Sequence, residues 1–319
     1  MTELRQHEKY DALIFACHAL APVPTAVAHP CDETSIRGAV EAAEVKIIKP
    51  ILVGPEARIR KLAASLNLDI SALEIVGTPH SHASAAKAVE LVRNGEVDAL
   101  MKGSLHTDEL MAEVVNKDTG IRTARRVSHV FIMDVPTYAK PLFITDAAIN
   151  IAPTLEDKVD IVQNAIELAQ ALNVKQPKVA ILSAVETVTS KIPSTIDAAA
   201  LCKMADRGQI TGALLDGPLA LDNAISREAA SIKHIVSPVA GDADILLVPD
   251  LEAGNMLAKE LTFLANADAA GIVLGARVPI ILTSRADNVR TRMASCAVAA
   301  LYAHARHAAA AAALVELAG

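Results

Sequence analysis

The chain has 319 residues and a formal net charge of −7, a length typical of two domains or of one large α/β domain. Apolar residues make up 52% of the sequence, aromatic residues only 2%, and tryptophan is absent. We therefore expect a large aliphatic core. The negative charge argues against a basic surface that binds nucleic acid, and the scarcity of aromatic side chains argues against stacking on bases. A local basic pocket for a small anion remains open.

The four cysteines, at positions 17, 31, 202 and 296, form no C-x-x-C pair and no metal-ligand spacing. We expect reduced, mostly buried thiols, a cytoplasmic location and no bound metal. The N-terminus is too polar for a secretion signal, and no apolar run is long enough to predict a membrane span. We interpret the alanine-rich stretch 307–314 as the end of a packed helix.

Apolar runs alternate with amphipathic helical stretches along almost the whole chain. Several runs are continuously apolar, as in strands that are covered on both faces. The expected strands are Ala12–Ala16, Pro50–Val53, Leu73–Val76, Ala99–Met101, Val130–Met133, Leu142–Thr145, Val179–Leu182, Gly212–Leu215, Ile245–Val248, Gly271–Leu274 and Ile280–Thr283. The expected helices are Thr34–Glu44, Pro55–Leu66, Ala83–Val92, Leu155–Leu172, Ser194–Ala205, Glu252–Leu264 and a long last helix after residue 287.

This alternation predicts an α/β fold with two doubly wound domains and mostly parallel sheets. The expected domains are residues 1–135 plus 276–319 and residues 136–275, and the C-terminal helix closes the first one. The hinge candidates are Pro136–Pro141 and Gly275–Pro279. Ligands of such sheets bind beyond the carboxyl ends of the strands, so we expect the functional residues in the loops that follow the strands.

The junction after the last expected strand combines a hydroxyl, a guanidinium and a carboxylate, at Ser284, Arg285 and Asp287. A long helical pattern begins there, and a helix start offers backbone N–H groups and positive dipole charge to an anion. Arg285 adds a fork suited to phosphate or carboxylate. The junction therefore predicts a small anion site. The alternative is that Asp287 caps the helix and the other two side chains lie on the surface.

Two further loops carry basic and hydroxyl groups. Lys102, Ser104 and His106 stand in a Gly-Ser turn after a strand, where backbone N–H groups can approach an anion. The alternative is an ordinary turn with Thr107 as helix cap. The second loop holds three arginines, at 122, 125 and 126, before a strand. It is either a phosphate-recognition loop or a solvated basic loop.

Carboxylates mark two more loops. Asp216 begins an Asp-Gly-Pro turn that is either structural or a source of polar site groups. In the other loop, Asp250 caps a helix or contributes to a site, and Gly254 at the helix start would let a ligand approach closely.

As a set, these loops resemble the phosphate acetyltransferase/phosphate butyryltransferase family. The matching segments are Met101–Thr107, Arg125–Met133, Ile144–Asp146, Asp216–Asn223, Val239–Asn255 and Pro279–Asn288. The Pro-Asp-Leu-Glu-Ala-Gly-Asn run at 249–255 is especially specific. The run from Arg126 to Asp134 is similar to the butyryl-type branch and to the acetyltransferase part of bifunctional enoyl-CoA hydratase fusions, although we expect no hydratase domain.

The resemblance implies two α/β domains of isocitrate/isopropylmalate dehydrogenase-like architecture, a cleft between them, and a homodimer. It also implies reversible transfer of an acetyl or short-chain acyl group between coenzyme A and inorganic phosphate. Acyl-CoA and phosphate are then substrates, no cofactor is held, and neither nucleic acid nor membrane is a partner.

The family's Ser-Arg pair corresponds to Ser284 and Arg285. Ser284 would donate to the carbonyl oxygen as it gains charge, Arg285 would bind phosphate, and Asp287 is our candidate general base. Cys296 as an acyl carrier is the alternative to direct transfer. The phosphate- and coenzyme A-binding candidates are Lys102, Ser104, His106, Arg122, Arg126, Ser128, Asp216 and Asn255.

Other functions stay open at this point. A butyryltransferase differs only in chain length, which depends on side chains that close the acyl pocket. An NAD(P)-dependent decarboxylating dehydrogenase is a second class, although the chain lacks a Gly-x-Gly-x-x-Gly fingerprint. A non-catalytic protein that binds acyl-CoA or phosphate is a third.

Overall fold

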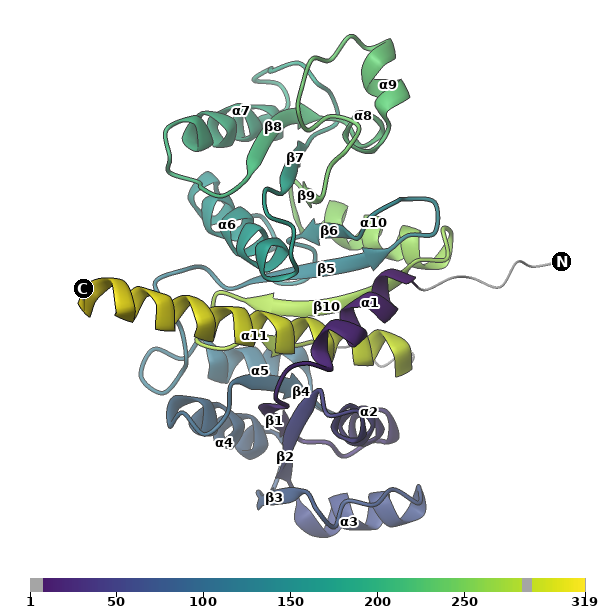
Figure 1. The fold of residues 1–319 in the computed structure, drawn as a ribbon, viewed down its shortest axis with the longest axis vertical. Coiled ribbons are helices and arrows are strands. Elements are labelled where there is room, and N and C mark those ends of the chain that lie inside the picture. Colours follow the sequence, from purple (N-terminus) through teal and green to yellow (C-terminus); the bar gives the residue numbers. More distant parts are fainter. Residues whose placement is uncertain (1–7, 283–288, 319) are drawn as a thin grey trace, which may run out of the picture. The chain divides into compact units, whose positions relative to one another are not determined.

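The computed structural model describes residues 8–282 and 289–318. Its chain divides into two compact units, each an α/β layer structure (Figure 1). The N/C unit comprises Tyr10–Arg125 and Ala270–Gly319, and the middle unit comprises Met1–Lys9 and Arg126–Ala269. The expected domain division, with breaks near residues 136 and 276, stays a prediction.

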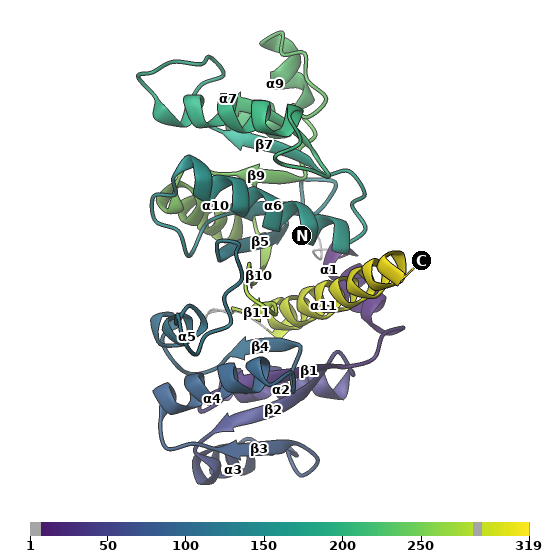
Figure 2. The same ribbon diagram turned by 90° about the vertical axis from the view of Figure 1, so that its left-hand side faces the viewer.

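In the N/C unit the strands lie in the order β3 (Glu74–Gly77), β2 (Ile48–Gly54), β1 (Val23–Ala28), β4 (Ala99–Lys102), β11 (Ile280–Ile281) and β10 (Asp268–Leu274). The first five are parallel, and β10 runs antiparallel to β11. The helices are α1 (Glu8–Cys17), α2 (Glu33–Glu44), α3 (Glu56–Ser65), α4 (Ser81–Arg93), α5 (Thr107–Val114) and α11 (Val289–Ala318). Helices α4 and α5 cover one face of the sheet, and α2 and α3 cover the other (Figures 1 and 2).

In the middle unit the strand order is β5 (Ser128–Asp134), β6 (Leu142–Thr145), β9 (Ile245–Leu247), β7 (Lys178–Leu182) and β8 (Leu214–Leu219). All are parallel except β5, which runs antiparallel to β6. The helices are α6 (Leu155–Ala171), α7 (Pro193–Asp206), α8 (Leu221–Ile225), α9 (Arg227–Ile232) and α10 (Leu251–Phe263). Helices α6 and α7 lie on one face of the sheet and α10 on the other (Figure 2).

Local sequence signals explain where several helices begin. The Asp32 carboxylate accepts from the backbone N–H of Ser35 at the start of α2. At the start of α6, Thr154 and Asp157 form a capping box, in which each side chain accepts from the other residue's backbone. These caps satisfy N–H groups that a helix leaves without an internal partner.

The α/β alternation with large sheets is confirmed, and ten of the eleven expected strands overlap observed ones. The expected strand Ala12–Ala16 is wrong, because these residues lie inside helix α1. A short apolar run does not distinguish a strand from a buried helix segment. Strand β1 has no counterpart among the expectations. It contains Pro24, and proline usually argues against a central strand.

Helix α11 differs from its expected packing. Its first half is buried among the core residues of the N/C unit, but residues 306–315 are exposed. The tail 307–314 is therefore not the packed helix end that we expected. By length and composition Arg290–Val315 passes as a candidate membrane span, also against expectation. One such helix, found by length and composition alone, is weak evidence for a membrane span.

Candidate functional site

The carboxyl ends of the parallel strands in the N/C unit bring several candidate residues to one edge of the sheet. Lys102 ends β4, and its register partner Ala28 ends β1. Strand β11 pairs with β4 in parallel through Ile281 and Met101, so it runs toward the same edge. Ser284, Arg285 and Asp287 follow β11 in sequence and lie outside the described residues.

The Gly-Ser turn after β4 does not offer its backbone to an anion as expected. The N–H groups of Gly103 and Ser104 donate to the carbonyl oxygens of Ala28 and His29, at 2.9 and 2.8 Å. A Cβ atom on Gly103 would lie 2.3 Å from the Ala28 oxygen. Glycine is therefore required at position 103, because the backbones that follow two strands meet here. The prediction that these two N–H groups bind an anion is wrong.

One side chain of this turn, the Ser104 hydroxyl, hydrogen-bonds Asp32. Burial opposes ionisation of this carboxyl, but hydrogen bonds from Ser35, Thr34 and Ser104 hold its pKa below the usual value. Lys102 is half-buried at the end of β4. His106 is exposed and is the N-cap residue of α5, without a side-chain cap bond. The alternative that Thr107 caps this helix is therefore wrong. The edge thus combines a carboxylate, a hydroxyl and basic groups.

In the middle unit, Arg126 lies before β5, and its guanidinium contacts two acceptor side chains. Its Nε donates to Asn150 Oδ1 at 2.7 Å, and its Nη1 lies 3.2 Å from Asp157. About half of the arginine side chain remains exposed. Any phosphate bound here would share the guanidinium with two protein acceptors.

Ser128 is fully buried, and its hydroxyl accepts from the Asn164 amide at 2.8 Å. The neighbouring His129 is also buried and stacks edge-on against Phe131, with ring centroids 4.3 Å apart. Burial lowers the pKa of His129 to about 4, although the nearby Asp146 charge opposes that shift. The geometry gives Ser128 a role within the core rather than an accessible substrate contact.

Two basic residues of the arginine loop belong to the N/C unit. Arg122 is exposed and forms an isolated β-bridge with Ala276. The backbone N–H of Arg125 donates to the Thr123 hydroxyl at 3.1 Å. Arg122 and Arg126 belong to different units.

Asp216 lies within strand β8 rather than in a turn after it. Its carboxylate accepts from the backbone N–H of Gly217 at 2.9 Å. Together with burial, its charge raises the pKa of the Cys202 thiol to about 12. Asp216 is thus half-buried against α7, the helix that carries Cys202, and its contacts there are structural.

The 249–255 motif is explained by packing within the middle unit. Asp250 caps α10 by accepting from Ala253 N–H at 2.8 Å. The Asn255 amide donates to the Ala147 carbonyl at 3.1 Å. A Cβ on Gly254 would lie 2.9 Å from the Ala147 Cβ. The glycine therefore permits close packing of α10 rather than the ligand approach that we expected.

All four cysteines are free thiols. Cys296 is fully buried in α11, and burial raises its pKa to about 12. A protonated, enclosed thiol is a poor nucleophile. Direct transfer is therefore favoured over an acyl-enzyme on Cys296.

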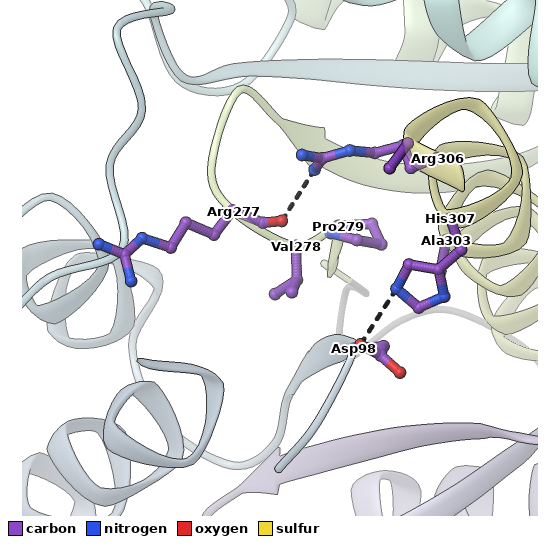
Figure 3. Close-up of a pocket in the computed structure, with 8 residues that line it drawn as sticks. Asp98, Arg277, Val278, Pro279, Ala303, Arg306 and His307 are labelled. Carbon is purple, nitrogen blue, oxygen red and sulfur yellow. Dashed lines mark hydrogen bonds and ion pairs between the residues drawn. The ribbon is translucent and has the colours of Figure 1, made fainter. Parts of the chain in front are cut away.

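A cavity of about 160 Å³ lies at the opposite edge of the N/C sheet (Figure 3). Asp98 and Pro279, which line it, directly precede β4 and β11. His307 lies 3.3 Å from Asp98, and Arg306 donates to the Arg277 carbonyl (Figure 3). The Arg277 side chain points away from this pair (Figure 3). The cavity therefore lies away from the strand ends that carry the candidate residues.

Comparison with known proteins gives one consistent result. Residues 79–300 match the family model described as "Phosphate acetyl/butaryl transferase". A phosphate acetyltransferase from Rhizobium meliloti is 70% identical over 304 residues, which cover 95% of this chain and 96% of the relative. A phosphate butyryltransferase from Clostridium acetobutylicum is 44% identical, covering 93% and 98%.

Among solved structures, a branched-chain phosphotransacylase from Enterococcus faecalis V583 superposes with a TM-score of 0.78 at 31% identity. That match covers 88% of this chain and 99% of the other. The chain therefore belongs to the phosphate acetyl/butyryl transferase family of acyltransferases.

Proposed function

We propose that this protein transfers an acetyl group reversibly between coenzyme A and inorganic phosphate. The observation that carries the proposal is the 70% identity, over nearly the whole of both chains, to a phosphate acetyltransferase. The 44% identity to a butyryltransferase makes butyryl transfer the second candidate. An isocitrate/isopropylmalate dehydrogenase-like arrangement of the two domains is part of the proposal.

The reaction requires three groups. The carbonyl oxygen gains charge as the thiol sulfur attacks and needs a hydrogen-bond donor; we assign this to Ser284. Phosphate needs a cationic fork, and we assign it to Arg285, with Arg122 and Arg126 as further contributors. The coenzyme A thiol, whose pKa is about 8.5 for a free thiol, must lose its proton. From the sequence alone, Asp287 is the candidate acceptor.

Lys102, Ser104 and His106 are proposed to contact phosphate or coenzyme A, because the N/C sheet places them at the carboxyl ends of its strands. Ligands of parallel α/β sheets bind at that edge. Asp216 and Asn255 are proposed as weaker candidates for substrate contact, since each already has a hydrogen bond within the middle unit.

We also propose a cytoplasmic homodimer. The cysteines are free thiols, as is usual in a reducing compartment. Met256, Phe263 and Leu264, on α10 and just after it, are more than 60% exposed. Such large apolar side chains are commonly buried in an oligomer. Light scattering of the purified protein tests the dimer, and a monomeric mass would contradict it.

The test of the activity is thioester formation from acyl phosphates and coenzyme A, followed by ultraviolet absorbance. We expect thioester from acetyl phosphate, and a series from acetyl to butyryl phosphate ranks the acyl groups. Absence of thioester from every acyl phosphate would favour the binding-protein alternative. Reduction of NAD(P) by a 2-hydroxy acid substrate would instead favour the dehydrogenase.

A further inference from the structure

His29 is held rigidly at the carboxyl edge of the N/C sheet, directly after β1. Its backbone N–H donates to the Val53 carbonyl at the end of β2, at 2.7 Å. Its own carbonyl accepts from Ser104 N–H, which follows β4, at 2.8 Å. Three parallel strand ends thus fix this residue where such sheets bind ligands.

The backbone of His29 is in the left-handed region, with φ of 58°. This conformation costs a non-glycine residue of order 1 kcal/mol. Among the described residues, five other non-glycine positions share it, and each follows a helix end: Lys46, Asn67, Asn173, His234 and Asn266. His29 instead follows a strand. A side chain kept in a costly conformation at a ligand-binding edge suggests a functional requirement.

A buried hydrogen-bond network holds the His29 ring in place. Its Nδ1 lies 3.0 Å from the Ser84 hydroxyl oxygen. Ser84 donates its single proton to the His80 carbonyl at 2.9 Å, and Thr78 lies 2.8 Å from the same hydroxyl oxygen. When Ser84 donates to the His80 carbonyl, Nδ1 donates to the Ser84 hydroxyl oxygen, and the neutral ring carries its free lone pair on Nε2.

The other ring nitrogen is available. Within residues 8–282 and 289–318, no hydrogen-bond partner of Nε2 is found. Only 6% of the His29 surface is exposed, and Nε2 points away from the Ser84 side of the ring. Nε2 is not among the described buried side-chain atoms that lack a hydrogen-bond partner, so this nitrogen reaches solvent and can be approached by a substrate.

Burial is the main reason that the pKa of His29 is lowered and the ring is neutral at physiological pH. Burial lowers the pKa of His29 below its ordinary value, and the Arg58 charge lowers it further. Glu109 and Asp32 act in the opposite direction, and His80 adds a smaller lowering effect. At pH 7 the Nε2 lone pair is thus free to accept a proton.

We propose that His29 Nε2 is the general base that deprotonates the thiol of coenzyme A, an inference that rests on the proposed acyl transfer. The thiol proton passes to Nε2 while sulfur bonds to the carbonyl carbon of the acyl phosphate. The carbon–oxygen bond to phosphate then breaks, and the imidazolium returns the proton to the departing phosphate. In the reverse direction the same nitrogen takes the phosphate proton and gives it to the thiolate. This assigns the proton transfer to His29 rather than to Asp287.

The sharpest variant is His29→Asn. Asparagine tolerates positive φ, and its amide N–H can replace Nδ1–H as the donor to Ser84. The variant therefore preserves the fold and removes only the Nε2 acceptor. We expect turnover of acetyl phosphate with coenzyme A to fall by about 10²–10⁴-fold. The loss of activity that wild type shows as pH falls through the His29 pKa, below about 6.5, should disappear in the variant.

The matched control is His307→Asn, at the opposite edge of the same sheet, which should keep wild-type turnover and pH dependence. The inference would be overturned if His29→Asn kept turnover within threefold of wild type and showed the same loss of activity at low pH. If wild type itself forms no thioester, the proposed function fails, which is a distinct outcome. If only Asp287→Asn abolishes the loss of activity at low pH, the base is Asp287.

A measurement on the unaltered protein guards against misfolding of the variant. With ¹⁵N-labelled histidine, we expect one Nε2 resonance that is unprotonated at pH 7 and shifts when coenzyme A is added. Its disappearance in His29→Asn assigns it. No histidine Nε2 shift at saturating coenzyme A would contradict the inference, whatever the variant's stability.

Discussion

The guanidinium of Arg126 lies 3.2 Å from the Asp157 carboxylate, so this candidate phosphate ligand is held by an acidic neighbour. The pair is half-exposed, and such pairs add no more than about 1 kcal/mol to stability. The main consequence of this ion pair would be competition, since the Asp157 carboxylate and a bound phosphate would use the same Arg126 guanidinium.

Replacing Asp157 with asparagine should therefore lower the KM for phosphate a few-fold. The amide oxygen can still accept from Thr154 N–H, so the helix cap survives. Arg126→Ala should raise the same KM. Asp160→Asn is the control, because Asp160 contacts only the Arg126 backbone N–H. If the KM for phosphate is unchanged in both test variants, Arg126 has only a structural role.

Arg285 is expected to be the principal phosphate ligand. Arg285→Ala should cut kcat by about 10²–10³-fold, the usual effect of losing one preorganised donor to transition-state charge, and should raise the KM for phosphate. Steady-state kinetics in both directions measure this. Arg290→Ala, which removes an ion pair with Asp11, serves as control. Near-normal kinetics of Arg285→Ala would remove Arg285 from the site.

The buried His129 should make the protein acid-sensitive. Its folded pKa of about 4 lies below the ordinary value of 6.5, so the unfolded chain binds a proton first as pH falls. Stability is thus fully present above pH 6.5 and declines toward pH 4, by about 3 kcal/mol. Urea unfolding across this range should show a shallower decline in His129→Gln and no change of slope in His18→Gln. Equal slopes in wild type and His129→Gln would show that another group is responsible.

Gly254→Ala should destabilise the protein although alanine favours helices. The added methyl would lie 2.7 Å from Val248 Cγ2, and overpacking costs about 1–3 kcal/mol, against a gain of about 1 kcal/mol in helix propensity. Gly77→Ala is the control, since its Cβ meets no atom within 4 Å. Thermal unfolding compares them, and a Gly254→Ala protein as stable as wild type would mean that α10 moves to accommodate the methyl.

The sequence predicted most of the fold because strands buried on both faces are continuously apolar. The secondary-structure prediction was wrong where the local sequence pattern and the tertiary packing favour different conformations. The apolar residues Ala12–Ala16 pack as a helix, and β1 forms despite Pro24. Both errors arise because neighbouring strands and helices, which sequence pattern does not specify, decide the conformation.

The candidate site was harder to predict for the same reason. The turn at Gly103 was expected, but its N–H bond to Ala28 joins residues 75 positions apart. Ser128 lies in a specific motif, yet its burial and its bond to Asn164 depend on the packing of α6. His29 was missed because strand β1 was missed. A histidine directly after a recognised strand would have drawn attention to this edge.

Acyl transfer to phosphate can be followed by ³¹P NMR of the purified protein with acetyl-CoA and inorganic phosphate. We predict a new acetyl phosphate signal, with one free coenzyme A thiol appearing for each phosphate consumed. Release of thiol together with acetate, without an acetyl phosphate signal at any time, would identify a hydrolase and contradict acyl transfer to phosphate.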